Sequence, residues 1–356
     1  MSRAAPEPSS QEHLREMASR WLSPSQVPAR FRVHEDTTDF FRVEYDDVVV
    51  LDGSPYLVRH NAKEQRFGLE DEVKFWVKRA VDLQNGELKI LKLVFYEKFL
   101  SHVGGLEFEC YRSPRKEARI LELVAGHPGF MQGHAIEDTA GNLIRVLDFI
   151  KGRPLSKEIT GLDLDHETYF HERLPDILNR FKEAVEGIRF LHENREKHGD
   201  IRRDHILVDR EDGRYRWIDF DYNYRHRENI YGYDLFGLGN ILAFLVGKGD
   251  VIVRDLAARN PDVLDRLSEE DLNLVFQNRV ANLRKVYPYI PEALNRVLLH
   301  FSRGTHVFYE HTSQLVSDLG EVLEARLPRP ERPIQEGGSH DESGEDLQQE
   351  HPHRGG

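Results

Sequence analysis

Two aspartates in the middle of the chain, Asp200 and Asp219, have the residue type and the surroundings of reactive carboxylates. Asp200 lies in the run His-Gly-Asp-Ile-Arg-Arg-Asp-His at 198–205, and Asp219 lies in Trp-Ile-Asp-Phe-Asp at 217–221. Each has apolar neighbours that could hold it at the edge of a core. A pair of carboxylates can divide the work of a reaction, because one accepts a proton from a hydroxyl group while the other holds a metal ion.

The two runs resemble the catalytic loop and the metal-binding loop of the protein-kinase-like superfamily. The His-Gly-Asp opening is similar to aminoglycoside phosphotransferases and other small-molecule branches, where protein kinases usually carry His-Arg-Asp. The resemblance implies that Asp200 is the catalytic base and that Asp219 holds the metal ion on ATP. It implies that Arg202 offsets charge on the transferring phosphoryl group, and that Asp234 braces the catalytic loop from the start of a helix.

Lys92 and Glu117 resemble the lysine and glutamate that form an ion pair in this superfamily. Lys92 lies in an expected strand within Lys-Ile-Leu-Lys at 89–92, and Glu117 lies in a helix expected from about Ser113. In the resemblance the lysine contacts the ATP phosphates and the glutamate orients it. The alternative interpretation is that Lys92 and Glu117 are ordinary solvated charges, in which case Lys89 is as good a candidate as Lys92.

The resemblance also implies an adenine pocket between two lobes. The run Val-Leu-Asp-Phe-Ile-Lys-Gly at 146–152 is similar to the hinge, where adenine would bond to the backbone near Asp148 and Ile150. Each pocket residue would be equally at home in a core. The expected nucleotide-binding residues are Val77, Ala80, Ile90, Lys92, Leu147, Asp148 and Ile150.

The position five residues after Asp200 departs from the protein-kinase pattern. His205 stands where those enzymes carry a metal-binding asparagine, and it is similar to the lipopolysaccharide-core sugar kinases there. Asp219 and His205 are expected to hold Mg²⁺. Because Mg²⁺ prefers oxygen ligands while imidazole suits softer ions, the alternatives are that the second metal ion is lost or that Mn²⁺ is preferred. A satisfied core histidine is an equally open interpretation of His205.

Three further departures concern loops. No glycine-rich phosphate loop is recognisable, since Glu70, Glu72 and Phe75 stand where glycines would be. The acids at 70–72 would repel phosphates, so the loop is displaced, Arg66 or Lys74 compensates, or nucleotide binding is weak. Asp221 replaces the glycine of the Asp-Phe-Gly element. Only fourteen residues lie between Asp219 and Asp234, which is similar to RIO-type atypical kinases and excludes a long activation segment.

The pattern of apolar residues predicts an α+β fold with two lobes, in which strands and one helix precede a mostly helical half. A small N-terminal antiparallel sheet with one helix forms the first lobe, and the second is larger. Strands are expected at 48–51, 56–58, 72–80, 87–95 and 143–150, and helices near 113–125, 177–191, 234–245, 291–302 and 312–325. The expected regions are an N-terminal extension at 1–40, the kinase N-lobe at 41–150, the C-lobe at 151–326 and a disordered acidic tail at 327–356.

Composition narrows the class of protein. Of the 356 residues 39% are hydrophobic, enough for a sizeable core, and the formal net charge of −13 argues against nucleic acid as the main partner. The single cysteine, Cys110, excludes an internal disulfide. The polar first ten residues and the lack of a run of about 20 apolar residues predict a cytoplasmic protein without a membrane span.

The sequence therefore favours an ATP-dependent phosphotransferase acting on a hydroxyl group, with a serine/threonine protein kinase as the leading interpretation. A sugar or other small-molecule kinase is the first alternative, supported by His-Gly-Asp, by His205 and by the short segment after Asp219. A pseudokinase that binds partners without phosphoryl transfer is the second, supported by the acids at 70–72.

Overall fold

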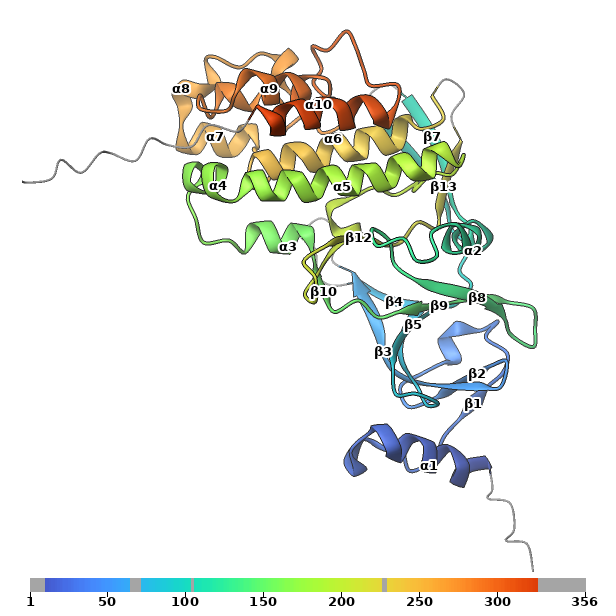
Figure 1. Cartoon of the computed structure of the whole chain (residues 1–356). Coiled ribbons are helices and arrows are strands. Elements are labelled where there is room, and N and C mark those ends of the chain that lie inside the picture. Colours follow the sequence, from blue (N-terminus) through green and yellow to red (C-terminus); the bar gives the residue numbers. More distant parts are fainter. Residues whose placement is uncertain (1–9, 65–71, 104–105, 226–228, 326–356) are drawn as a thin grey trace, which may run out of the picture.

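The computed structural model describes residues 10–64, 72–103, 106–225 and 229–325. These residues form two lobes (Figure 1), a lobe built on a β-sheet and a lobe built mainly from helices. The two-lobed α+β architecture predicted from the sequence is confirmed. The predicted acidic tail at 327–356 and the loop acids Glu70 and Asp71 lie outside the described residues.

A seven-stranded sheet forms the N-lobe, in the order β1-β2-β3-β4-β5-β9-β8. All neighbouring strands are antiparallel except β1 and β2, which are parallel. The strands are β1 (Val33–His34), β2 (Val48–Leu51), β3 (Ser54–Glu64), β4 (Glu72–Asp82), β5 (Leu88–Lys92), β8 (Gly133–Glu137) and β9 (Leu143–Asp148).

Tight turns fix the register of this sheet. Asp52 and Gly53 join β2 to β3 with φ values of 47° and 75°, the left-handed conformation that two-residue hairpin turns require. Gly86 joins β4 to β5 with a φ of 78°.

The first described helix packs onto this lobe. Helix α1 (Ser10–Trp21) buries Leu14 and Met17 in a cluster with sheet residues, among them Val48. Strand β1 adds to the edge of the sheet. The boundary predicted at residue 41 thus divides elements that the structure packs together.

A second sheet connects the two lobes. Strands β6 (Lys98–Val103) and β7 (Leu106–Arg112) form a hairpin, and β13 (Tyr222–Arg225) pairs with β7 in an antiparallel arrangement. The sequence analysis placed no strands here. Because β13 begins one residue after Asp221, this pairing fixes the chain that leaves the second aspartate run.

Helix α2 (Pro114–Leu123) follows directly from β7. The Ser113 side chain accepts a hydrogen bond from the Lys116 amide at 3.2 Å, and Pro114 occupies the first turn, as the sequence predicted. The helix lies between the sheet and the C-lobe (Figure 1).

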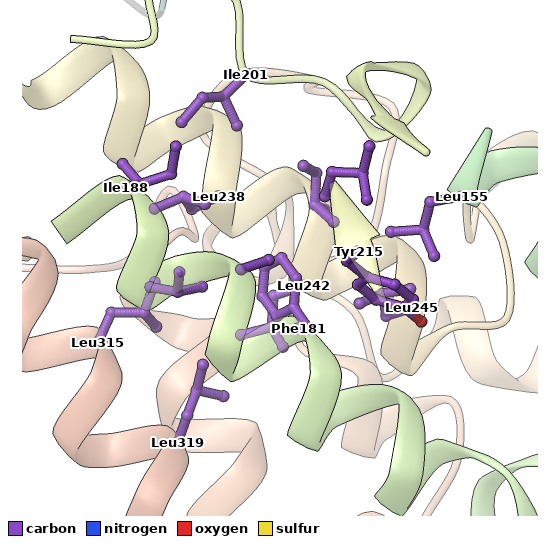
Figure 2. Close-up of a cluster of buried hydrophobic side chains, with 14 of the residues drawn as sticks. Leu155, Phe181, Ile188, Ile201, Tyr215, Leu238, Leu242, Leu245, Leu315 and Leu319 are labelled. Atoms are coloured by element: carbon purple, nitrogen blue, oxygen red, sulfur yellow. The ribbon is translucent and has the colours of Figure 1, made fainter. Parts of the chain in front are cut away.

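The C-lobe is built around two long helices, α5 (Leu174–Glu193) and α6 (Gly232–Val246). Their side chains join α10 in one apolar core, where Phe181, Leu238 and Leu315 lie close together (Figure 2). The remaining helices of this lobe are α3 (Leu155–Thr160), α4 (His166–Glu172), α7 (Val253–Arg259), α8 (Pro261–Leu264), α9 (Glu292–Leu299) and α10 (Thr312–Glu324).

A three-stranded sheet in the order β10-β11-β12 lies where the lobes meet. Its strands are β10 (Gly152–Pro154), β11 (Ile206–Asp209) and β12 (Tyr215–Trp217). The run at 198–205 ends where β11 begins, and Ile218 and Asp219 follow β12. The hairpin of β11 and β12 therefore brings the two aspartate runs to the same edge.

Candidate functional site

The loop of Asp200 is fastened to the C-lobe on both sides of the aspartate. The next side chain, Ile201, is buried beside α6 (Figure 2). Asp234, in the first turn of α6, accepts hydrogen bonds from the backbone amides of His198 at 2.8 Å and Gly199 at 2.9 Å. A carboxylate is favoured at the start of a helix, so Asp234 stabilises α6 and also positions the loop of Asp200.

The loop of Asp219 leaves β12 in an unusual backbone conformation. Asp219 has a φ of 60°, in the left-handed region that aspartate tolerates better than most residues. Phe220 is fully buried, with its ring edge-on to His198 at 6.1 Å and to Phe130 at 6.2 Å between ring centroids. The buried ring holds Asp219 at the lobe interface.

Lys92 lies at the centre of a buried group of charges. Its Nζ is 2.7 Å from Glu117 Oε1, 3.0 Å from Asp219 Oδ1 and 3.1 Å from Asp221 Oδ2. Burial alone would lower the pKa of Lys92, but the carboxylates of Asp219, Asp221 and Glu117 outweigh it and raise the pKa above the usual value. The structure thus brings together the lysine and glutamate that the sequence paired.

Lys89, the alternative lysine, lies elsewhere. It pairs with Glu87 at 2.7 Å and with Asp148 at 2.8 Å near the surface, and it does not line the pocket that Lys92 lines. The geometry favours Lys92 for the predicted role.

Asp219 meets a second lysine on its other oxygen. Lys74 Nζ, from β4, lies 3.3 Å from Asp219 Oδ2. Burial would raise the pKa of Asp219, but Lys74, Lys92 and His205 hold it well below its usual range. Lys74, suggested as a cation that offsets the acids at 70–72, thus contacts Asp219, and its effect on those acids stays a prediction.

His205 lies between the two aspartates. Its Nδ1 is 2.8 Å from the Asp200 carbonyl oxygen and 3.5 Å from Asp200 Oδ2, while its Nε2 is 3.7 Å from Asp219 Oδ2. A carbonyl can only accept, so Nδ1 carries the proton, and the lone pair on Nε2 accepts from Arg202 Nη2. Arg202 Nη2 lies 2.6 Å from the same Nε2, and its Nε is 3.4 Å from Asp200 Oδ1.

Two buried arginines of this site were missed by the sequence analysis. Arg145, on β9, is fully buried and donates to Glu117 Oε2 at 2.9 Å. Arg112, at the end of β7, donates to Asp221 Oδ2 at 2.5 Å. For Arg145 the sequence does hold a signal, because a charged residue inside the apolar run Leu-Ile-Arg-Val-Leu at 143–147 suggests a buried charge. That run does not reveal its partner.

Arg112 explains the aspartate that replaces glycine at 221. Burial would raise the pKa of the Asp221 carboxyl, but Lys92 and Arg112 lower it far below its usual value. The guanidinium also lies over the ring of Tyr222 at 4.2 Å. Asp221 is thus an anchor between the Asp219 loop and the inserted hairpin of β6 and β7.

A cavity of about 750 Å³ opens between the lobes beside these charges. Lys92, Asp219, Lys74 and His205 line its polar end. Of the residues expected to bind a nucleotide, Val77, Ile90, Lys92, Leu147, Asp148 and Ile150 line it.

Ala80 is the exception, and its prediction as a pocket residue is wrong. It is fully buried in the core on the other side of the sheet, with Val49 and Val58. Successive strand residues point to opposite faces, so Val77 and Ala80, three positions apart, cannot both face the cavity in a regular strand. Arg79, an even step from Val77, lines it instead.

Asp200 and Arg202 lie beside the cavity rather than in its lining, and His205 connects them to it. The arrangement can hold an anionic group against Lys92 and Lys74, and a cation against Asp219 and His205. It places a further carboxylate, Asp200, where it can accept a proton.

Comparison with known proteins gives two curated relatives. The chain is 30% identical over 110 residues to "Putative ribosomal protein S6 kinase alpha-2" of Caenorhabditis elegans, which is 30% of this chain and 13% of that protein. It is 26% identical over 114 residues to "Serine/threonine-protein kinase 17A" of Oryctolagus cuniculus, which is 32% of this chain and 28% of that protein. The matches thus span well under half of either relative.

No protein-family model matches the chain. Among solved structures, the Mycobacterium tuberculosis PknI kinase domain aligns with a TM-score of 0.43 and 13% identity, over 78% of this chain and 99% of that chain. No helix in the described part of the chain combines the length and the apolar character needed to cross a lipid bilayer. The two curated relatives, both named as kinases, bear out the resemblance of this chain to the protein-kinase-like superfamily.

Proposed function

We propose that this chain is an ATP-dependent phosphotransferase that transfers the γ-phosphoryl group to a hydroxyl. The observation that carries the proposal is the position of the Lys92–Glu117 ion pair beside Asp219, at the polar end of a cavity whose other walls are largely apolar. An adenine ring suits the apolar walls and a triphosphate suits the lysines.

In this proposal adenine lies between Val77, Ile90 and Leu147. It would bond to the Asp148 carbonyl and the Ile150 amide. Lys92, oriented by Glu117, would bind phosphate oxygens, and Arg145 would hold Glu117 in place. Lys74 would stabilise the negative charge that develops on the transferring group.

Asp200 would accept the proton of the acceptor hydroxyl. Its loop is fixed by Asp234 and Ile201, so the carboxylate is held ready before the acceptor binds. Arg202, 3.4 Å away, would keep the carboxylate oriented and offset phosphoryl charge.

Asp219 and His205 fit a divalent cation. An oxygen and an imidazole nitrogen 3.7 Å apart could share one ion once Arg202 releases the Nε2 lone pair, and the nitrogen favours Mn²⁺ over Mg²⁺. The described residues contain no group of three or more His, Cys, Asp or Glu side chains that could enclose a metal, so phosphate oxygens and water would complete the shell. When bound, the cation would neutralise phosphate charge.

A serine or threonine of a protein is the acceptor we favour. The names of both curated relatives describe protein kinases, and one names serine/threonine specificity. A small-molecule hydroxyl is the second candidate, favoured by His205 at the asparagine position and by the short connection between Asp219 and Asp234.

Transfer of label from γ-labelled ATP tests the proposal. The purified chain is incubated with labelled ATP, Mg²⁺ or Mn²⁺ and an extract of its own cells, and label is followed into protein, lipid or saccharide, and small-molecule fractions. Label in one fraction should fall by at least about 1,000-fold in Asp200→Asn and Asp219→Asn. Asp262→Asn, at an exposed position on α8, is the matched control and should keep its activity.

The fraction that takes up label identifies the acceptor class. Label in the protein fraction supports a protein kinase, and label in a smaller molecule supports the second candidate. If no label depends on Asp200 with either metal, the phosphotransferase proposal fails and a nucleotide-binding protein without transfer remains.

A further inference from the structure

Lys116, next to Glu117 on α2, has no role in the site as described so far. Its side chain is buried, with 2% of the residue exposed. The ammonium group donates to three backbone carbonyls, those of His198 at 2.7 Å, Phe220 at 2.9 Å and Tyr222 at 2.5 Å. An ammonium has three protons, so each has an acceptor.

The three carbonyls belong to the two loops that carry the candidate reactive groups. His198 precedes Asp200 by two residues, and Phe220 follows Asp219 directly. The lysine itself is the neighbour of Glu117 on the helix. One side chain therefore connects the three segments that carry Asp200, Asp219 and Glu117.

Gly199 makes this connection possible. Its φ is 87°, and a Cβ at this position would overlap the Tyr222 carbonyl oxygen and lie 3.2 Å from Lys116 Nζ. Any larger residue would push away an acceptor of the lysine. The glycine that stands in place of the usual arginine of His-Arg-Asp thus makes room for the ammonium and its third carbonyl.

We propose that Lys116 is a positioning residue for phosphoryl transfer, and that Lys116 with the carbonyls of His198, Phe220 and Tyr222 forms a carbonyl clamp. The clamp sets the position of α2 relative to the loops of Asp200 and Asp219. It rests on the proposed function. Because the lysine is far in sequence from both loops, it fixes contacts that neither loop could make alone.

Lys116→Met tests the clamp, since methionine keeps most of the apolar stem and removes the donor. Three buried carbonyls then lose their shared partner, and the loops can shift relative to α2. The walls of the adenine pocket are untouched. We expect kcat to fall by at least about tenfold while KM for ATP changes by less than about threefold.

Lys78→Met is the matched control. Lys78, on β4, is also a buried lysine that donates to a carbonyl, that of Val43 at 2.5 Å, and burial lowers the pKa of both lysines to about 8. It touches neither catalytic loop. Its loss should lower the melting temperature but leave kcat within about twofold of the unaltered chain.

Amide hydrogen exchange gives a second measurement that does not depend on activity. Backbone amides at 198–200 and 219–224 should exchange faster in Lys116→Met than in Lys78→Met, and Gly199→Ala should give the same pattern. Equal kcat losses in the two lysine variants, or unchanged exchange at those amides, would overturn the clamp.

The two proposals fail in different ways. If the unaltered chain shows no Asp200-dependent transfer, the proposed function is wrong and the clamp loses its catalytic role, whatever the exchange pattern. If transfer is present and Lys116→Met retains kcat, only the clamp is wrong.

Discussion

The charges around Lys92 are arranged so that each buried carboxylate has more than one cationic neighbour. Glu117 lies between Lys92 and Arg145, and Asp221 lies between Lys92 and Arg112. Buried ions are costly unless paired, so removing one partner leaves an unpaired charge rather than simply losing one contact. The residues that sequence reasoning missed here are therefore as important to the site as those that it found.

Arg145→Met should lower the free energy of unfolding by about 3–5 kcal/mol, because it leaves one buried oxygen of Glu117 without its donor. Adding Glu117→Gln should cost less than the sum of the two single changes. Urea unfolding of the four proteins measures both effects. Arg153→Met is the control, since Arg153 is exposed and lies 3.8 Å from Glu158, and it should change stability by less than about 0.5 kcal/mol.

His166 should make the C-lobe sensitive to acid. Its ring stacks on Tyr287 at 3.5 Å, Nδ1 lies 2.7 Å from the Tyr289 hydroxyl, and Nε2 lies 2.9 Å from the Val246 carbonyl. Burial lowers the pKa of His166 to about 4 from the ordinary value of 6.5. The unfolded chain then binds more protons between these values, so stability falls as the pH drops from about 6.5 toward 4.

His166→Phe keeps the stacked ring and cannot titrate. We expect its free energy of unfolding to change less between about pH 7 and pH 5 than that of the unaltered chain, even though loss of the hydrogen bonds lowers it at both. Urea unfolding at the two pH values gives the comparison. Parallel pH dependence in the two proteins would contradict the expectation.

At the residue scale, residues that belong to a recognisable motif could be predicted from the sequence. Residues whose position depends on a partner far away in the chain could not. Lys92 and Glu117 were paired because their order along the chain matches the superfamily. Ala80 was misplaced because the strand repeat of two residues was not applied between it and Val77. Arg112 could not be assigned, since its partner Asp221 is 109 residues away in sequence.

At the scale of elements, helix α6 determines how closely the C-lobe can pack. A Cβ added at Gly239 would overlap the ring of Phe301, and one added at Gly237 would lie 2.6 Å from the Ile201 Cβ and 2.7 Å from the Ile201 carbonyl oxygen. These glycines let the helix approach the loop of Asp200. Gly320, on α10, has only Lys182 Cε at 3.6 Å.

Glycine-to-alanine changes should therefore have opposite effects on the two helices. Gly320→Ala should raise the free energy of unfolding by about 0.5–1 kcal/mol, because alanine favours a helix and the site has room. Gly239→Ala should lower it by about 1–3 kcal/mol through overpacking against Phe301. Thermal and urea unfolding measure both, and a stabilising Gly239→Ala would show that α6 is not closely packed against Phe301.

The elements with a clear repeat were predicted well, and those that depend on a partner strand were not. The run 177–191 and the Ser113-Pro114 start gave helices α5 and α2, since local pattern and capping are enough for a helix. Strands β6 and β7 carry no such local signal. They are completed by β13, more than 100 residues later, a pairing that the local pattern does not contain.

At the scale of the whole molecule, the proposed nucleotide would contact both lobes and should stabilise them together. ATP with a divalent cation at about 100 times its Kd should add about 2.7 kcal/mol to the free energy of unfolding. We expect a larger melting-temperature increase with Mn²⁺ than with Mg²⁺, and loss of the metal dependence in Asp219→Asn. Thermal unfolding with each metal, with and without ATP, measures the effect.

His205→Asn separates the metal preference from nucleotide binding. Replacing the imidazole nitrogen by an amide oxygen should reduce the advantage of Mn²⁺ over Mg²⁺ while ATP continues to stabilise the chain. An unchanged ratio between the metals would show that His205 is a packing residue, held by the Asp200 carbonyl.

The placement of Trp217 gives the molecule an optical probe of its own. Trp217 precedes Asp219 by two residues, and its indole is fully buried. The indole N–H donates to the Ala184 carbonyl at 2.9 Å, and the ring centroid lies 5.0 Å from that of His198. The chain has only two other tryptophans, Trp21 at the surface and Trp76 stacked on Phe95. With those two replaced by phenylalanine, the remaining tryptophan emission comes from a residue beside the loops of Asp200 and Asp219, so movements of these loops can be followed by fluorescence without an attached dye.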